Sequence, residues 1–290
     1  MSDMRIFVAL WVALGVPGVS ALFQDRVVAW SAPKASRDVV DRLNALRQAS
    51  GLAVVQLDED LSRGCDRHAR YLARNEREPS TQGLGAHDEK KELAGWSEEG
   101  ELAASRSVIA WQPPGAAVED FMASLFHRVP LLSPALVRIG VGHASGGRWR
   151  DITVIDIMGG LDGRDLKGAS PVLCPAPDAM GVSARFAPEL PDPTGGVADQ
   201  AGIAITVTWF DPTATITDVK ITLLTQTNSL EGLSSSPDAP ACADHARKNR
   251  NTVCFIPKRA LASNTRYSAS VSCLVNGEPW RRQWSFTTGP

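Results

Sequence analysis

The hydrophobic pattern of this 290-residue chain separates a first region, up to about Gly159, from a second one. In most of the first region, apolar residues recur every three to four positions, which is the spacing of one face of an α-helix. After it, short runs rich in β-branched residues are separated by turn-forming residues, which is typical of strands. Several helices and then paired strands, without regular alternation, predict an α+β fold followed by an all-β region.

Two helices are predicted near the start of the first region. We expect Ser36 to cap the first helix and Gly51 to end it, and Asp58 to cap the second. The apolar face of the first comprises Val39, Val40, Leu43 and Leu46, and that of the second comprises Leu61, Cys65, Ala69 and Leu72. His68 lies near the second apolar face, so we expect it to be a packed, satisfied histidine.

A third helix is predicted over residues 101–110, and Pro113 and Pro114 end it. A fourth helix places Val118 and Phe121 on one side, with His127 at its C-terminal end. The helix dipole would favour a protonated imidazole at such an end. Two strands, residues 138–144 and 149–158, complete the region.

The second region contains short β-branched runs at residues 203–209, 219–224, 252–256, 266–275 and 280–287. Asn276-Gly277 suits a two-residue hairpin turn of the primed type. Short strands with regular turns predict an immunoglobulin-like or fibronectin-like β-sandwich. We place the first domain at residues 36–160, a linker at 161–175 and the sandwich at 176–290, as a structural or presenting module.

Residues 1–21 predict a Sec-type signal peptide: Arg5, a short apolar run, and small residues before a cleavage point after Ala21. The run is interrupted by Pro17 and is short for a membrane span of about 20 residues, although an uncleaved anchor is the alternative. We therefore expect a secreted or extracellular protein, with the periplasm or cell surface as other locations. A formal net charge of -2 gives no basic field for nucleic acid.

Five cysteines follow the signal peptide, in a compartment where disulfides persist. Five is an odd number, so at least one stays free or pairs outside the chain. Cys242 and Cys254 flank a polar turn and are the preferred bridge, whereas Cys65 lies on a helix face and is expected to pack as a small hydrophobe.

Three polar residues, each at the boundary of a predicted element, are the candidates for a common site: His87, Glu101 and His127. A neutral imidazole binds a metal or accepts a proton, and a carboxylate orients it. The two histidines are the candidate metal ligands, and all three residues are candidates for catalysis. Ser124 lies near His127, but the nucleophile-elbow pattern Gly-x-Ser-x-Gly is missing.

An ordered series of short motifs runs through the first region: Asn44-Ala-Leu-Arg47, Leu57-Asp-Glu-Asp-Leu61, His87, Gly100-Glu-Leu102, Ser124-Leu-Phe-His-Arg128, Leu131-Leu-Ser-Pro134 and Ile139-Gly-Val-Gly142. In this order they resemble the CAP superfamily, also called SCP-like domains, and especially its compact bacterial branch. The resemblance covers residues 38–160. It implies an α-β-α sandwich with a surface cleft lined by two histidines and two acidic residues.

Matched by motif, three of these four cleft residues are His87, Glu101 and His127. The sequence departs from the family pattern at the fourth, because the acids Glu119 and Asp120 precede the aromatic Phe121 and are expected to face elsewhere. A second departure is Leu102, where the family has Asn.

Two functions stay open. The first is an exported binding protein whose cleft holds a divalent metal or a small ligand; the resemblance implies lipid or sterol binding in some members, so a lipid or cell-surface component is a candidate partner. Zinc held by two imidazoles, with water completing its shell, would be weak and labile. The second is an extracellular hydrolase or peptidase, with or without a metal.

Overall fold

The structure is a computed structural model that describes residues 33–146, 151–248 and 251–290. The predicted signal peptide, residues 1–21, lies outside these residues. From residue 32 onward the chain forms one compact unit. Within the described ranges, no helix is long and apolar enough to span a membrane.

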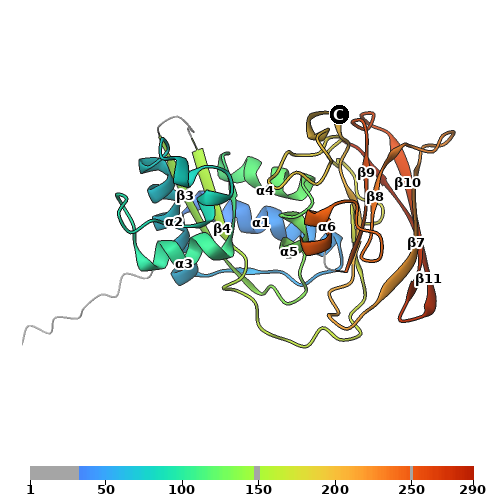
Figure 1. The fold of residues 1–290 in the computed structure, drawn as a ribbon, viewed down its shortest axis with the longest axis horizontal. Helices are drawn as coiled ribbons and strands as arrows, with labels where there is room; N and C mark the ends of the chain where they lie inside the picture. The colour runs from blue at the N-terminus through green and yellow to red at the C-terminus, as the bar shows by residue number, and fades with distance from the viewer. Residues whose placement is uncertain (1–32, 147–150, 249–250) are drawn as a thin grey trace, which may run out of the picture. The chain divides into compact units, whose positions relative to one another are not determined.

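The first region is built on a four-stranded mixed sheet in the order β1-β3-β4-β2; Figure 1 labels its two central strands, β3 and β4. Its strands are β1 (Gln56–Leu57), β2 (Ser107–Ala110), β3 (Arg138–Ser145) and β4 (Asp151–Asp156). The short β1 is parallel to β3, and the other pairs are antiparallel. The predicted strands at 138–144 and 149–158 are therefore confirmed as the central pair of this sheet within the described residues, which do not include residues 149 and 150.

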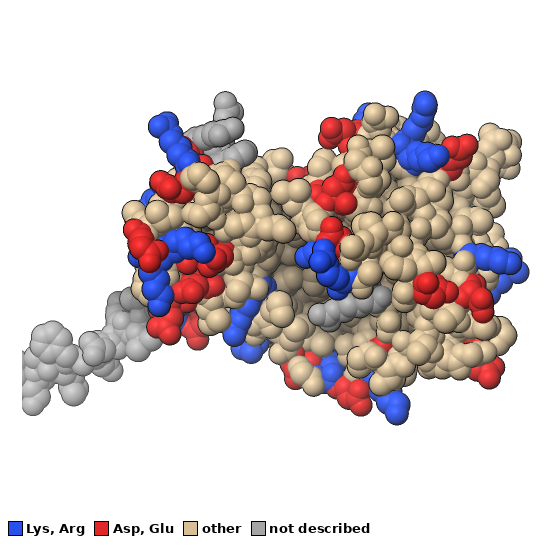
Figure 2. Space-filling model, in the orientation of Figure 1, with Lys and Arg blue, Asp and Glu red and all other residues tan. Residues whose placement is uncertain are grey.

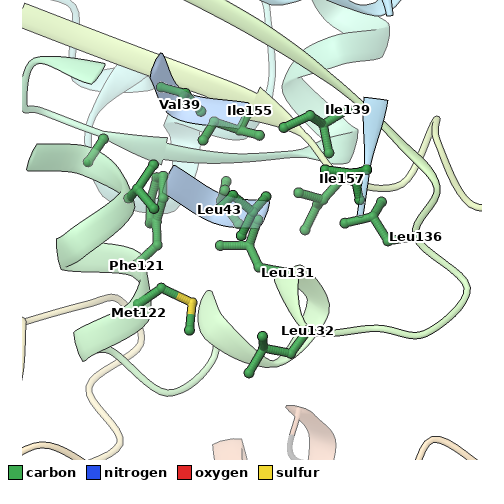
Figure 3. Close-up of a cluster of buried hydrophobic side chains, with 14 of the residues drawn as sticks. Val39, Leu43, Phe121, Met122, Leu131, Leu132, Leu136, Ile139, Ile155 and Ile157 are labelled. Atoms are coloured by element: carbon green, nitrogen blue, oxygen red, sulfur yellow. The ribbon is translucent and has the colours of Figure 1, made fainter. Parts of the chain in front are cut away.

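Helices cover both faces of this sheet. Helices α1 (Lys34–Ala49) and α4 (Pro114–Ala123) pack on one face, where Leu43, Phe121 and Ile139 share a buried cluster (Figure 3). Helices α2 (Glu59–Arg74) and α3 (Glu98–Arg106) pack on the other face, in a second cluster. Side chains of β3 and β4 alternate between the two faces of the sheet and contribute to both clusters. The result is a three-layer α-β-α arrangement.

The motifs of the first two helices have local structural roles. The Asp58 side chain accepts a hydrogen bond from the backbone N–H of Leu61 at 3.0 Å and caps α2, as predicted. Asn44 forms two hydrogen bonds with the backbone of Val55. Arg47 is fully buried and donates to four carbonyl groups, those of Ala53, Leu131, Ser133 and Leu136.

Two predicted helix boundaries are wrong. Residues 107–110 form β2 rather than the end of a helix, because the β-branched Val108 and Ile109 pair with β4. Helix α1 begins at Lys34, directly after Pro33, so Ser36 is buried inside the helix instead of capping it.

The second region contains two antiparallel sheets with the orders β5-β6-β9-β8 and β11-β10-β7. The first comprises β5 (Val172–Cys174), β6 (Ile205–Thr208), β8 (Gly232–Ser235) and β9 (Thr252–Pro257), and the second comprises β7 (Ile216–Leu224), β10 (Arg266–Val275) and β11 (Glu278–Thr287). Side chains of both sheets, Val207 and Ala269 among them, share one buried cluster, so the sheets pack face to face.

The turn between β10 and β11 confirms the predicted hairpin. Asn276 and Gly277 have φ angles of 52° and 85°, the left-handed conformation that a primed turn requires at both central residues. The predicted linker at 161–175, in contrast, includes β5, because Val172 and Cys174 pair with β6 and join the buried cluster of the α-β-α region.

The predicted Cys242–Cys254 disulfide is not formed. Cys242 is exposed just before α6 (Ala243–Lys248), whereas Cys254 is buried in β9 with its Sγ 3.9 Å from Nδ1 of His245. The Cys254 side chain faces the layer between the β5-β6-β9-β8 sheet and the first region, and it packs there against apolar residues.

Direct contacts connect the α-β-α region to the β-sheets. The guanidinium group of Arg128, at the start of α5 (Arg128–Leu131), is fully buried and donates to the carbonyl oxygens of Met122 and Ala204. Leu125 and Phe126 pack against residues of β9 and its surroundings.

Figure 2 shows acidic and basic side chains interspersed on the visible face, with no large patch of one sign.

Candidate functional site

A cavity of about 450 Å³ lies in the α-β-α region and contains both predicted histidines. Its polar lining residues are His87, Gln112, Asp120, Ser124, His127 and Glu189. Its apolar lining includes Leu84, Ile109, Phe121 and Leu190. An adjoining hollow of about 370 Å³ shares His87 and His127 with the cavity.

His87 ends the 3₁₀ turn η2 (Gly83–His87), which forms one wall of the cavity. Its Nδ1 lies 3.1 Å from the carbonyl oxygen of Ala104 in α3, and because a carbonyl only accepts, this nitrogen carries the hydrogen. Nε2 is then an acceptor in the neutral ring. Burial lowers the pKa of His87 below the ordinary value of 6.5, which favours the neutral ring near pH 7.

A buried pair, His68 and Glu89, holds the 3₁₀ turn in place on the side away from the cavity through a contact with Ala86. His68 and Glu89 are both fully buried at their side chains, with Nδ1 of His68 2.9 Å from Oε1 of Glu89. The other ring nitrogen of His68 lies 2.8 Å from the carbonyl oxygen of Ala86, which precedes His87. The prediction that His68 is a packed, satisfied histidine is confirmed.

His127 lies between α4 and α5, not at the C-terminal end of a helix as predicted. Helix α4 ends at Ala123, where Ser124 becomes extended and its hydroxyl donates to the carbonyl oxygen of Phe121. His127 instead precedes the first turn of α5. The predicted stabilisation of a protonated His127 by the dipole of the preceding helix therefore does not apply.

Glu189 is the acid that contacts His127, and it was not among the residues predicted for the site. Its Oε2 lies 2.7 Å from Nδ1 of His127, and its side chain is only 1% exposed. The carboxylate also accepts hydrogen bonds from the backbone N–H groups of Leu125, Phe126 and His127. This contact favours the His127 tautomer with hydrogen on Nδ1, which leaves Nε2 as the acceptor.

Glu189 comes from the segment before β6, within the range predicted as the second domain. It follows Pro188 in an irregular stretch without hydrophobic period, so neither spacing nor pattern distinguishes it from a surface acid. A long-range contact with His127 has no local signal in the sequence.

Asp120 also lines the cavity, contrary to the prediction that it faces elsewhere. Its neighbour Glu119 does face away, because it forms an ion pair with Arg42 of α1. Burial raises the pKa of Asp120 above its usual range. The cavity thus contains two histidines and two acids, but the acids are Asp120 and Glu189.

The structure does not bring Glu101 to the cavity. Glu101 lies in the first turn of α3, where its Oε2 accepts a hydrogen bond from the indole N–H of Trp96 at 3.1 Å. It is not among the lining residues of either hollow. Its observed contact is with the turn that precedes α3.

The cavity offers few side chains that could bind zinc. Across residues 33–146, 151–248 and 251–290, no group of three or more His, Cys, Asp or Glu side chains is arranged to hold a metal ion. Stable zinc sites use three or four protein ligands. His87 and His127 would provide two, each through its remaining nitrogen, Nε2.

The three-layer fold agrees with a family match. Residues 40–157 match the CAP family, described as the cysteine-rich secretory protein family. We call this stretch the CAP-like region. The match confirms the resemblance for this part of the chain and supports its mixed α/β, CAP-like fold.

One solved structure similar to this chain is an extracellular protein containing an SCP domain from Bacillus anthracis str. Ames. The two chains are 18% identical, with a TM-score of 0.32, over 42% of this chain and 39% of that chain. The match therefore spans less than half of either protein. No match was found among curated proteins.

Proposed function

We propose that this protein is exported and that the cavity of its CAP-like region binds a small ligand, with His87 and His127 as polar contacts. The observation that carries the proposal is that two histidines from distant segments line one cavity. Each has its Nδ1 next to a protein acceptor, which leaves Nε2 for a ligand. A cavity with apolar walls and a few placed polar groups is typical of ligand sites.

Export is supported by the sequence pattern of residues 1–21 and by the secretory description of the matching family. For the two packed sheets that follow, we propose an immunoglobulin-like module with a supporting role. The segment between β5 and β6 contributes Glu189 to the cavity of the CAP-like region.

Ligand binding is tested by NMR, using the imidazole C–H signals of the five histidines. The His87→Gln and His127→Gln variants assign the two cavity signals. Titration with n-hexanol, a neutral probe with an apolar chain, should shift these two signals saturably. The signal of His143, which pairs with Asp151 outside the cavity, should stay in place. Equal shifts of all five signals, or none, would contradict the proposal.

A water-activating hydrolase is the second candidate, because a histidine oriented by a buried carboxylate is a common general base. In the parent protein, His127 and Glu189 would supply this pair. The His127→Gln variant should then hydrolyse a peptide library at least about 100-fold more slowly than the parent, since general-base catalysis contributes about this much. Equal rates for both proteins would remove this candidate.

Zinc binding by His87 and His127 remains a prediction with its own measurement. Calorimetric titration with zinc should show weak uptake by the parent and none by His127→Gln. If neither protein takes up zinc, the metal hypothesis is wrong, and the ligand-binding proposal is unaffected.

A further inference from the structure

Apart from the amide of Gln112, which can both donate and accept, the polar side chains that the cavity offers to a ligand are acceptors. His87 and His127 present Nε2, because each Nδ1 faces a protein oxygen. The hydroxyl of Ser124 already donates its hydrogen to Phe121. A ligand that fits this set must therefore bring hydrogen-bond donors.

Asp120 is the acidic residue of the cavity whose carboxylate is available to accept hydrogen bonds from a ligand. Its carboxylate is half-buried and lines the cavity, and no residue in the described part of the chain donates a hydrogen bond to it or forms an ion pair with it. Glu189, in contrast, is occupied by three backbone N–H groups and by His127. A partly desolvated carboxylate without a partner is costly, and a cation from a ligand would offset that cost.

The charge of the residues that line the cavity also favours a cationic ligand. Asp120 and Glu189 are acidic, and none of the described residues that line the cavity is Lys or Arg. Lys248 belongs to the adjoining hollow. Two leucines on the lining, Leu84 and Leu190, are 56% and 58% exposed, which provides apolar surface at the cavity mouth.

We propose that the cavity binds a primary ammonium group carried on an apolar chain. The group donates three hydrogens, to the Asp120 carboxylate and to Nε2 of His87 and His127, and the chain lies against Phe121 and the exposed leucines. The ring of Phe121 adds a face that attracts a cation. This inference rests on the proposed ligand-binding function and names its ligand class.

The test compares n-hexylamine, n-hexanol and hexanoate, which share one chain length and differ in the head group. Dissociation constants come from the NMR signals of His87 and His127 at pH 7.5, where the amine is protonated. The amine should bind about tenfold more tightly than the alcohol, and hexanoate more weakly than either.

Two neighbouring substitutions on α4 separate the role of Asp120 from a general change in charge. Asp120→Asn should remove the preference for the amine, so that amine and alcohol bind alike. Glu119→Gln loses the same charge one residue away, on the side that pairs with Arg42, and should keep the tenfold preference. Circular dichroism confirms that both variants are folded.

The outcomes distinguish the two proposals. If hexanol shifts both histidine signals but the amine binds no more tightly, the ammonium inference is wrong while the ligand-binding function stands. If the preference survives Asp120→Asn, the assignment of Asp120 is wrong. If none of the three probes moves either signal, the ligand-binding function itself is contradicted.

Discussion

At the scale of single residues, Glu189 determines how the turn between α4 and α5 closes. Its carboxylate accepts from three consecutive backbone N–H groups, those of Leu125, Phe126 and His127, at distances between 2.6 and 3.2 Å. These donors lie outside both helices, between the end of α4 and the start of α5. One acidic side chain therefore fixes the backbone that positions His127.

Replacing Glu189 with Ala should lower the free energy of unfolding by about 3 kcal/mol, because buried N–H groups lose their acceptor at about 1–3 kcal/mol each. Glu189→Gln keeps one acceptor oxygen and should cost about half as much. Urea unfolding provides the measurement. The exposed Glu231, which pairs with Lys258 at the surface, is the control: Glu231→Ala should change stability by less than about 0.5 kcal/mol. Equal effects at both positions would disprove the role of Glu189.

His87 should make stability depend on pH. Burial lowers its pKa in the folded state below the ordinary value of 6.5, so the unfolded chain binds the proton more readily. The stabilisation of the neutral ring is complete above pH 6.5 and is lost as pH falls through the folded pKa. The stability difference between the parent and His87→Gln should therefore be constant above pH 7 and shift against the parent at lower pH. A difference that is constant from pH 7 down to pH 4 would contradict this.

The histidines of the cavity could be predicted from the sequence, but its acids could not. His87 and His127 follow recognisable motifs, which the family resemblance placed in one cleft. Asp120 depends on which side of α4 faces the cavity, and two adjacent acids leave that choice open. Glu189 depends on a contact between residues more than 60 positions apart, and no local pattern encodes such a contact.

At the scale of elements, helix α2 lies directly on strand β3. A Cβ added at Gly142 would come within 2.1 Å of the backbone of Cys65, and one at Gly140 within 2.4 Å of the backbone of Leu61. The two glycines of the Ile139–Gly142 motif therefore allow the helix and strand backbones to approach closely. This explains why the motif alternates a branched residue on one face with no side chain on the other.

Gly142→Ala should destabilise the protein by about 2–3 kcal/mol or more, because the added methyl group meets backbone that can move only with the whole helix. Gly115 is the matched control: it lies in α4, and an added Cβ meets nothing within 4 Å. Gly115→Ala should be neutral or stabilise by about 0.5 kcal/mol, as expected for Gly to Ala in a helix. Thermal unfolding compares the two, and equal melting temperatures would exclude tight packing of α2 on β3.

Element types were predictable where the hydrophobic period was long. Helices α1 and α2 and strands β10 and β11 extend over at least ten residues each, and their patterns are clear. Strand β2 has four residues and directly follows α3, so its short apolar run alone predicts a continuation of that helix. The three-residue β5 lies within the predicted linker, because its pairing with β6 depends on tertiary structure rather than on a local pattern.

At the scale of the whole molecule, the CAP-like region and the sheets share buried surface. Leu125 is fully buried in a cluster that also contains Phe186, Cys254 and Ile256. The guanidinium of Arg128 reaches Ala204 and the Sγ of Cys174 from its position in α5. Since residues 32–290 form one compact unit, we expect the full chain to unfold in a single transition.

A fragment ending at residue 160 should therefore be much less stable than the full chain. It would expose Leu125, whose burial contributes about 1.5–3 kcal/mol, together with its apolar neighbours. It would also leave the Arg128 charge and the three N–H groups bound by Glu189 without their partners, at several kcal/mol more. Urea unfolding and dye binding to exposed apolar surface measure the loss, and adding the complementary fragment, residues 161–290, should restore part of it. A fragment as stable as the full chain would show that the site forms without the sheets, which contradicts the dependence of His127 on Glu189.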